Sequence, residues 1–157
     1  MKSAIFGPPE PSFVKGGTHL SVHLVPVFER KLVVFDVAAG AGAGRWLPWD
    51  VLPWRGNPYT TASELADNWC EGRVRDLRPL DTISLDVDGG GWELALVFRA
   101  ELLSPPPGDE HRTVVLLDRA PAEGIQRFSP VELERWVDET AGITGPRGSE
   151  ARARLVF

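Results

Sequence analysis

Four oxygen-bearing side chains in the middle of the chain are spaced for one region of a helix surface. Glu64, Asp67 and Glu71 lie three and four residues apart, with Asn68 beside them, and this separation brings side chains to the same side of an α-helix. Carboxylate and amide oxygens are ligands that Mg²⁺ and Mn²⁺ accept, and a metal held there faces phosphate oxygens of a substrate. One interpretation is therefore a metal site.

A plainer interpretation uses the same residues. Glu64 stands three positions after Thr61, which is the spacing of a capping box at a helix start. In that case the other acids only face water, as on most amphipathic helices. Because one Mg²⁺ needs no more than one or two carboxylates beside substrate phosphates, weak metal binding stays open.

An aromatic segment precedes this helix. Three of the six tryptophans, Trp46, Trp49 and Trp54, fall within nine residues, and Arg55 follows directly. Trp49 and Trp54 are candidates for stacking on a flat ligand, and Arg55 for holding a phosphate or carboxylate. The alternatives are that the tryptophans belong to the core or to a subunit interface, and that Arg55 is an ordinary surface residue.

The histidines and the cysteine give weaker signals. His19 and His23 alternate with apolar residues, so we expect them on the outer side of a strand, roughly 13 Å apart and too distant to share a metal. His111 lies in a polar loop, where a solvated side chain is favoured over a general base. Cys70 has no histidine beside it, which argues against a nucleophile.

Length and composition limit the classes of protein. The chain has 157 residues, which predicts one domain over 1–157 with a core of its own. A single cysteine excludes an internal disulfide framework and favours a reducing compartment, so we expect the cytoplasm. No apolar run approaches the roughly 20 residues that span a bilayer, so no membrane association is expected. The net charge of −5 argues against broad nucleic-acid binding.

The elements that position these residues follow from periodicity and turn signals. Alternation predicts a half-buried strand at 20–24 and an apolar run predicts a buried strand at 32–37. A small-residue loop at 38–44 and an extended aromatic connection at 46–54 come next. The first helix is expected to begin near Thr61 and to stop near Gly72.

The second half adds a hairpin, a strand and a helix. Residues 83–87 and 92–103 flank a glycine-rich turn, and 114–117 form a short strand. Ser129 opens a capping box with Glu132, and the helix is expected to end at Gly142. Residues 1–17 are a Pro/Gly-rich lead-in, and 143–157 are a tail or an edge strand. The order predicts an α+β fold, a mixed β-sheet with helices packed on its faces.

This order resembles the Nudix hydrolases over most of residues 18–140. The resemblance rests on Leu52-Pro53 before the first helix, on the strand 94–103, and on the aromatic-to-Glu-Leu stretch 128–133. In that family a loop-helix-loop signature binds magnesium or manganese through helix carboxylates. The resemblance implies a Nudix-like fold, with Glu64, Asp67, Asn68 and Glu71 at the metal position.

The signature itself is degenerate. Trp54-Arg55 stands where the family has two glycines, and residues 63–68 stand where it has Arg-Glu-aliphatic-x-Glu-Glu. There only Glu64 and Leu65 match, while Asp67 is a shorter acid and Asn68 is neutral. The preceding segment is also shorter than the family pattern and lacks its glutamate. The resemblance therefore implies a standard metal site that has been eroded.

Three functions remain. The leading hypothesis is non-catalytic binding of a nucleotide-like small molecule, or of a protein partner, by a Nudix-like protein. The alternative is an atypical Nudix hydrolase of a nucleoside diphosphate derivative, in which Glu64 and Asp67 are the catalytic pair that carries a water-activating Mg²⁺ or Mn²⁺. The third is a structural homodimer without a ligand.

Overall fold

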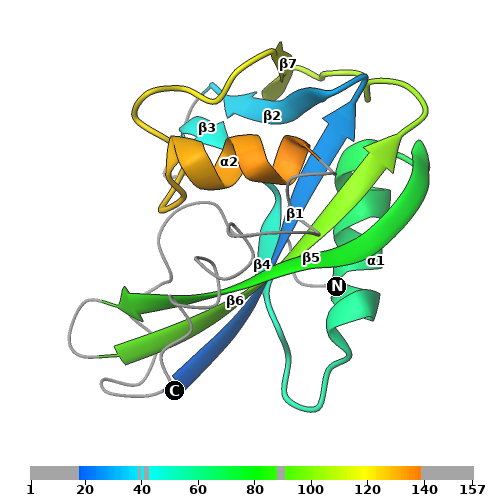
Figure 1. Ribbon diagram of the computed structural model, residues 1–157. Coiled ribbons are helices and arrows are strands. Elements are labelled where there is room, and N and C mark those ends of the chain that lie inside the picture. Colours follow the sequence, from blue (N-terminus) through cyan, green and yellow to red (C-terminus); the bar gives the residue numbers. More distant parts are fainter. Residues whose placement is uncertain (1–17, 39, 41–42, 88–90, 139–157) are drawn as a thin grey trace.

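The computed structural model describes residues 18–38, 40, 43–87 and 91–138 (Figure 1). Seven strands and two helices follow one another within these residues. Their bounds are β1 Thr18–Phe28, β2 Lys31–Val37, β3 Gly44–Trp46, β4 Trp49–Val51, α1 Pro58–Cys70, β5 Val74–Val87, β6 Gly91–Leu102, β7 Arg112–Leu117 and α2 Pro130–Val137.

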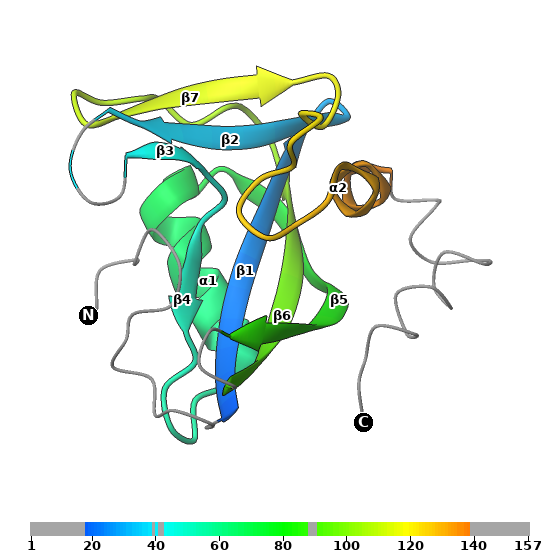
Figure 2. The ribbon, with the colours of Figure 1, turned by 90° about the vertical axis from the view of Figure 1, so that its left-hand side faces the viewer.

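The strands form one mixed sheet between the two helices. The order is β3-β2-β1-β6-β5, with β4 paired to β1 and β7 paired to β2. β1 and β6 are parallel, whereas the other pairs are antiparallel. Figures 1 and 2 show α1 on one side of β1 and α2 on the other. The expected α+β class, a mixed sheet with helices on its faces, is confirmed.

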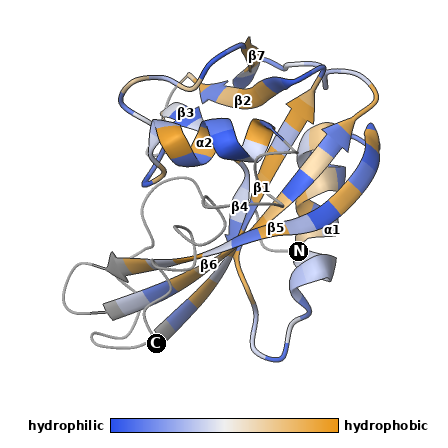
Figure 3. Cartoon of the chain, in the orientation of Figure 1, coloured by the Kyte–Doolittle hydropathy of each residue, from blue (hydrophilic) through white to orange (hydrophobic). Residues whose placement is uncertain are grey.

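The parallel pair β1 and β6 forms the centre of the molecule. Their register runs from Thr18 opposite Trp92 to Val27 opposite Glu101, and hydrophobic residues are frequent along both strands (Figure 3). The prediction that β1 is only half-buried is wrong, because Ser21 and His23 are buried as fully as their apolar neighbours. A strand that is paired on both edges and covered on both faces has no solvent side.

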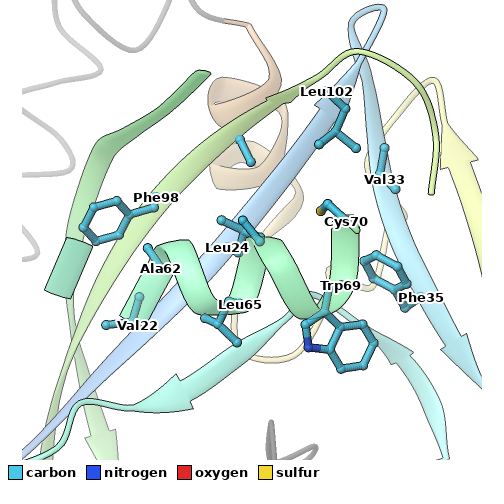
Figure 4. Close-up of a cluster of buried hydrophobic side chains, with 12 residues drawn as sticks. Val22, Leu24, Val33, Phe35, Ala62, Leu65, Trp69, Cys70, Phe98 and Leu102 are labelled. Carbon is cyan, nitrogen blue, oxygen red and sulfur yellow. The ribbon is translucent and has the colours of Figure 1, made fainter. Parts of the chain in front are cut away.

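One hydrophobic core lies between the sheet and α1 (Figure 4). Phe35 of β2 meets Trp69 of α1 edge to face, with ring centroids 4.9 Å apart. The other buried members of this cluster are Val22, Leu24, Val33, Ala62, Leu65, Ala66, Cys70, Phe98, Ala100 and Leu102.

The predicted start of α1 is wrong by about one turn. The helix begins at Pro58, and the side chain of the N-cap residue Asn57 accepts a hydrogen bond from the Tyr59 amide (2.8 Å). Asn at the N-cap followed by Pro at the first helical position is a strong start signal. Thr61 is instead a buried residue within the helix. α1 ends at Cys70, close to the expected stop at Gly72.

The extended connection before α1 contains two short strands, β3 and β4. The sequence-based prediction also missed the first half of β5. This strand starts at Val74, whereas the alternation of apolar and polar residues is visible only from Ile83. The earlier half carries charges and Pro79, and its register against β6 shifts at 74–76 and again at 79–81. Bulges move side chains to the other face, and so they erase the period of two.

The capping box that opens α2 is confirmed, with Ser129 and Glu132 bonded reciprocally. The predicted end at Gly142 is wrong, because Asp138 already has an extended conformation. Arg99 of β6 donates to the carbonyl oxygen of Trp136 (3.2 Å), which places a cation at the negative end of the helix dipole. The lead-in 1–17 and the segment 143–157 lie outside the described residues.

A second polar contact holds α2 to the sheet. The carboxylate of Asp81 on β5 accepts from the guanidinium of Arg135 and from the indole nitrogen of Trp136 (2.9 Å). Both ionic side chains are largely buried. Together with Arg99, this contact fixes the position of the helix on the sheet.

Asp81→Asn is expected to lower the free energy of unfolding by about 2–3 kcal/mol, because the buried Arg135 loses its counter-charge. Urea denaturation measures the change. Asp76→Asn is the matched control on the same strand, since Asp76 is exposed and 3.9 Å from Arg78, and the expected change there is under about 0.5 kcal/mol. Equal effects of the two substitutions would contradict a structural role for the Asp81 contact.

Candidate functional site

The structure places the acidic residues of α1 on its outer side. Glu64, Asp67 and Asn68 are exposed, while the opposite side of the helix packs into the core. Glu71 is not part of the helix, because it is the C-cap residue with φ of 50°. Its carboxylate pairs with Arg73 at 3.2 Å. Of the four predicted metal ligands, the helix therefore presents Glu64, Asp67 and Asn68 together and directs Glu71 to a neighbouring cation.

These residues do not form a preformed cage for a divalent cation. In the part of the chain that the structure describes, no three His, Cys, Asp or Glu side chains are close enough to share a metal ion. Zinc sites usually have three or more protein ligands, whereas one Mg²⁺ is held by one or two carboxylates together with substrate phosphates. Glu64 and Asp67 have no ion-pair partner among the described residues, so two free carboxylates are what remains of the predicted site.

The C-terminal end of α1 is occupied by an arginine from β7. Arg112 donates to the backbone oxygen of Asn68 (3.2 Å), and its guanidinium lies 4.0 Å from the centre of the Trp69 ring. A cation at a helix C-terminus is favourable because of the helix dipole. This contact neutralises the end of the helix nearest to Asn68, which further weakens the case for a metal there.

The three tryptophans of the aromatic segment are separated in space. Trp49 is 2% exposed and stacks on His23, with ring centroids 5.6 Å apart. Trp54, by contrast, is 90% exposed in the turn between β4 and α1. Trp49 therefore belongs to the core, whereas Trp54 is available for a contact at the surface.

Two further exposed residues, Arg55 and Tyr59, follow Trp54 within five positions of the chain. Arg55 is exposed, has φ of 60°, and makes no ion pair with a described residue. Tyr59, in the first turn of α1, is 51% exposed and meets Phe98 edge to face. The first turn of α1 contains no acidic residue. An aromatic ring and a free guanidinium thus adjoin a helix N-terminus, a combination that suits a flat ligand with an anionic group.

A buried polar cluster on the α2 side of the sheet was not predicted. The hydroxyl of Ser21 donates to Glu93 Oε1 (2.5 Å) and lies 3.0 Å from His23 Nε2, while Arg127 pairs with the other oxygen of Glu93. These residues come from β1, β6 and the loop before α2. The sequence signals this cluster only through polar residues inside otherwise apolar strands. The pairing of β1 with β6 is what brings Ser21 and His23 close to Glu93.

The cluster is not a serine-hydrolase triad, although it holds a serine, a histidine and an acid. In a triad the carboxylate orients the histidine through Nδ1 and leaves Nε2 for the serine. Here both Ser21 and Glu93 lie on the Nε2 side of His23, and Nδ1 has no hydrogen-bond partner among the residues that the structure describes. All three side chains are also buried. We therefore interpret the cluster as a structural one.

The electrostatics of this cluster shift two titrations. Burial opposes the charge of Glu93, but the nearby His23, the hydrogen bond from Ser21 and the charge of Arg127 outweigh it and lower the pKa to about 2. Burial also lowers the pKa of His23, and the nearby Glu93 opposes this only in part. Glu93 is thus an anion and His23 neutral at physiological pH.

The other candidate nucleophile and base are unsuited to catalysis. Burial raises the pKa of the Cys70 thiol to about 12, so a thiolate is not available at neutral pH. His111 is exposed and lies 3.3 Å from Glu110, in agreement with a solvated loop.

A hollow of about 700 Å³ lies between the β1–β2 turn, the end of β7 and α2. Its floor is apolar, from Leu32, Leu117 and Leu133, and its rim carries charges of both signs. Arg99 lines it but already bonds Glu101 and α2. The hollow is on the opposite side of the sheet from Glu64 and Asp67, so the two features do not form one site.

Comparison with known proteins gives a fold. No protein-family model and no curated protein matches the chain, but solved structures do. The Nudix domain of Shewanella oneidensis NrtR, complexed with ADP ribose, is 14% identical with a TM-score of 0.57, over 84% of this chain and 93% of that one. An ADP compounds hydrolase is 16% identical with a TM-score of 0.54, over 78% and 72%.

A MutT Nudix hydrolase from Burkholderia pseudomallei is 12% identical with a TM-score of 0.51, over 81% of this chain and 98% of that one. These likenesses show that the chain has a Nudix-like fold. Neither described helix is long and apolar enough to cross a membrane.

Glu93→Gln is expected to reduce stability above pH 5 by about 3 kcal/mol, because the folded-state pKa of Glu93 is about 2 against 4.5 when unfolded. The stabilisation by the carboxylate is complete above pH 4.5 and is lost as the pH falls toward 2. The difference between wild type and variant should therefore shrink over that range. Chemical denaturation at a series of pH values measures it, and a constant difference would contradict the assignment.

Proposed function

We propose that this protein binds a nucleotide-like ligand, of the nucleoside diphosphate class, without hydrolysing it. The observation that carries the proposal is the outer face of α1, which presents the carboxylates of Glu64 and Asp67 and no third described acid within metal-binding reach. The fold is retained while the dense carboxylate cluster implied by the family signature is not.

The chemistry of diphosphate hydrolysis explains why the number of carboxylates on α1 matters. Cleavage requires a cation that neutralises the developing charge and a water that it activates. A firmly held cation needs several ligands in fixed positions. This sequence has Asn68 where the family signature has an acid, and Glu71 pairs with Arg73. Two carboxylates on a solvated helix face make such a cation weakly bound at best.

Recognition is proposed at the turn between β4 and α1. A flat base would stack on Trp54, a contact of about 1–3 kcal/mol by analogy with base stacking on aromatic residues. Arg55 would hold a phosphate through paired hydrogen bonds. The likeness to the Nudix domain of NrtR, which was solved with ADP ribose, supports this choice of ligand class. A protein partner that uses the same exposed tryptophan is the second form of this hypothesis.

Hydrolysis remains the competing function because one observation favours it. Glu64 and Asp67 lie on one exposed helix face and neither is engaged in an ion pair with the described residues. Substrate phosphates can supply the remaining ligands of one Mg²⁺. The two functions differ in turnover, which an assay can measure directly.

ADP-ribose at saturating concentration is expected to raise the melting temperature by several degrees, since ligand at 100 times its dissociation constant stabilises by about 2.7 kcal/mol. Trp54→Ala should abolish the rise and Arg55→Ala should reduce it. The matched controls are Leu103→Ala, at an apolar side chain 63% exposed elsewhere, and Arg75→Ala, at an exposed arginine on β5. Both should behave as wild type.

A turnover assay with Mg²⁺ or Mn²⁺ separates the two functions. Cleavage of ADP-ribose that Glu64→Gln abolishes would replace binding by hydrolysis as the function. Absence of both cleavage and a thermal shift, with ADP and ADP-ribose alike, would contradict the small-molecule proposal and leave the protein-partner form.

A further inference from the structure

The hollow between α2, the β1–β2 turn and the end of β7 is lined by charged side chains, and some of them already have partners. Arg99 bonds to Glu101 and to the last carbonyl oxygens of α2. Asp118 pairs with Lys31 at 3.6 Å, and Asp138 has a contact of its own. The charges of these lining residues are therefore largely balanced within the protein.

Three other charged residues of the hollow make no ion pair with a described residue. They are Arg30 in the β1–β2 turn, Arg119 after β7 and Glu134 on α2, and all three are exposed. Figure 2 shows α2 beside the turn that joins β1 to β2 and beside the C-terminal end of β7. Because both arginines belong to the sheet and Glu134 belongs to the helix, the unbalanced positive charge is concentrated on the sheet side of the hollow.

The ladder between β2 and β7 explains why the two arginines line the same hollow. Leu32 and Leu117 are register partners at the end of this ladder. Arg30 stands two positions before Leu32, and Arg119 stands two positions after Leu117. Side chains two residues apart along a strand share a face, and all four of these residues line the hollow. Each arginine therefore lies just beyond a leucine of the floor.

The two arginines are also opposed to each other. Lys31 and Asp118, the first pair beyond the leucines, carry opposite charges and form an ion pair, which indicates that the register continues past the strands. Arg30 and Arg119 are the next pair and carry the same charge. Like charges directly opposite each other destabilise paired strands. A bound anion between the two guanidinium groups removes this repulsion.

Arg30 occupies a backbone position that favours glycine. Phe28 and Lys31 are register partners, so Glu29 and Arg30 form a two-residue turn, and their φ angles are 47° and 64°. Turns with two positive φ angles prefer Asn-Gly or Asp-Gly, because a Cβ in this conformation costs stability. The arginine is thus unfavourable for the turn and has no ion-pair partner among the described residues, which points to a role in binding.

We propose that the hollow binds a small organic anion, with a carboxylate or phosphate head group and an apolar body. The head group lies between Arg30 and Arg119, because each guanidinium can donate paired hydrogen bonds to such a group. The apolar body covers the leucine floor, and Glu134 on the opposite wall repels the head group toward the arginines. The volume of about 700 Å³ lies within the range of small-molecule sites. This site is separate from the ligand site proposed at Trp54 and Arg55.

Calorimetric titration of the full chain with octanoate and octyl phosphate tests the proposal, and the tighter of the two identifies the preferred head group. Octanol has the same apolar body without the charge and should bind about ten-fold more weakly or less. Octylammonium should not bind, because its charge is repelled by the arginines. Inorganic phosphate should bind about ten-fold more weakly than octyl phosphate, because it has no body to cover the leucine floor.

Arg30→Gly separates binding from folding. It relieves both the positive φ and the opposed charge, so it should raise the melting temperature by a few degrees while it weakens octanoate binding about ten-fold or more. Glu29→Gly is the matched control, because it relieves the same turn at a residue outside the lining of the hollow, and it should bind octanoate as wild type does. Arg119→Gln should weaken binding to a similar extent without lowering the melting temperature.

Failure of both octanoate and octyl phosphate to bind wild type overturns the proposal, and so does binding that is unchanged in Arg30→Gly and Arg119→Gln. A fall in the melting temperature of these two variants without ligand also overturns it, since the arginines then serve the fold. Trp54→Ala should leave octanoate binding unchanged, and Arg30→Gly should leave the thermal shift with ADP-ribose unchanged. The two ligand proposals can therefore fail separately.

Discussion

The parallel pairing of β1 with β6, covered on both faces, is the constraint on which the other features depend. It joins strands that are more than sixty positions apart and buries most of their side chains from Ser21 onward. Polar side chains buried there are favourable when they bond to one another. Ser21, His23 and Glu93 find one another, and Arg99 finds the last carbonyls of α2.

The two sides of this sheet have different characters. On the α1 side the core is apolar, and polarity lies on the outer surface of the helix, where Glu64 and Asp67 are solvated. On the α2 side polar contacts enter the core itself, through Glu93 with Arg127 and through Asp81 with Arg135. Trp54 and Arg55, where we propose that the ligand is recognised, are exposed in the turn before α1. Ligand binding at that turn would leave the packed core undisturbed.

The sequence predicted more of the fold than of the site. The β5–β6 hairpin, the capping box at Ser129 and the mixed sheet were all visible in local patterns, because turn chemistry and apolar periodicity are local. The start of α1 was misplaced because two cap signals, at Asn57 and Thr61, compete within four residues. The first half of β5 was missed because its bulges interrupt the alternation.

The sequence by itself determined most of the helices and strands and the scarcity of carboxylates on the first helix. Composition and spacing are local properties, so they do not depend on which segments meet in the fold. Tertiary structure alone decided that His23 and Trp49 are core while Trp54 is exposed. It also decided that Glu71 pairs with Arg73 and that β7 joins the sheet beside β2. The reason is that burial and pairing are properties of neighbours brought together from distant parts of the chain, which local spacing does not encode.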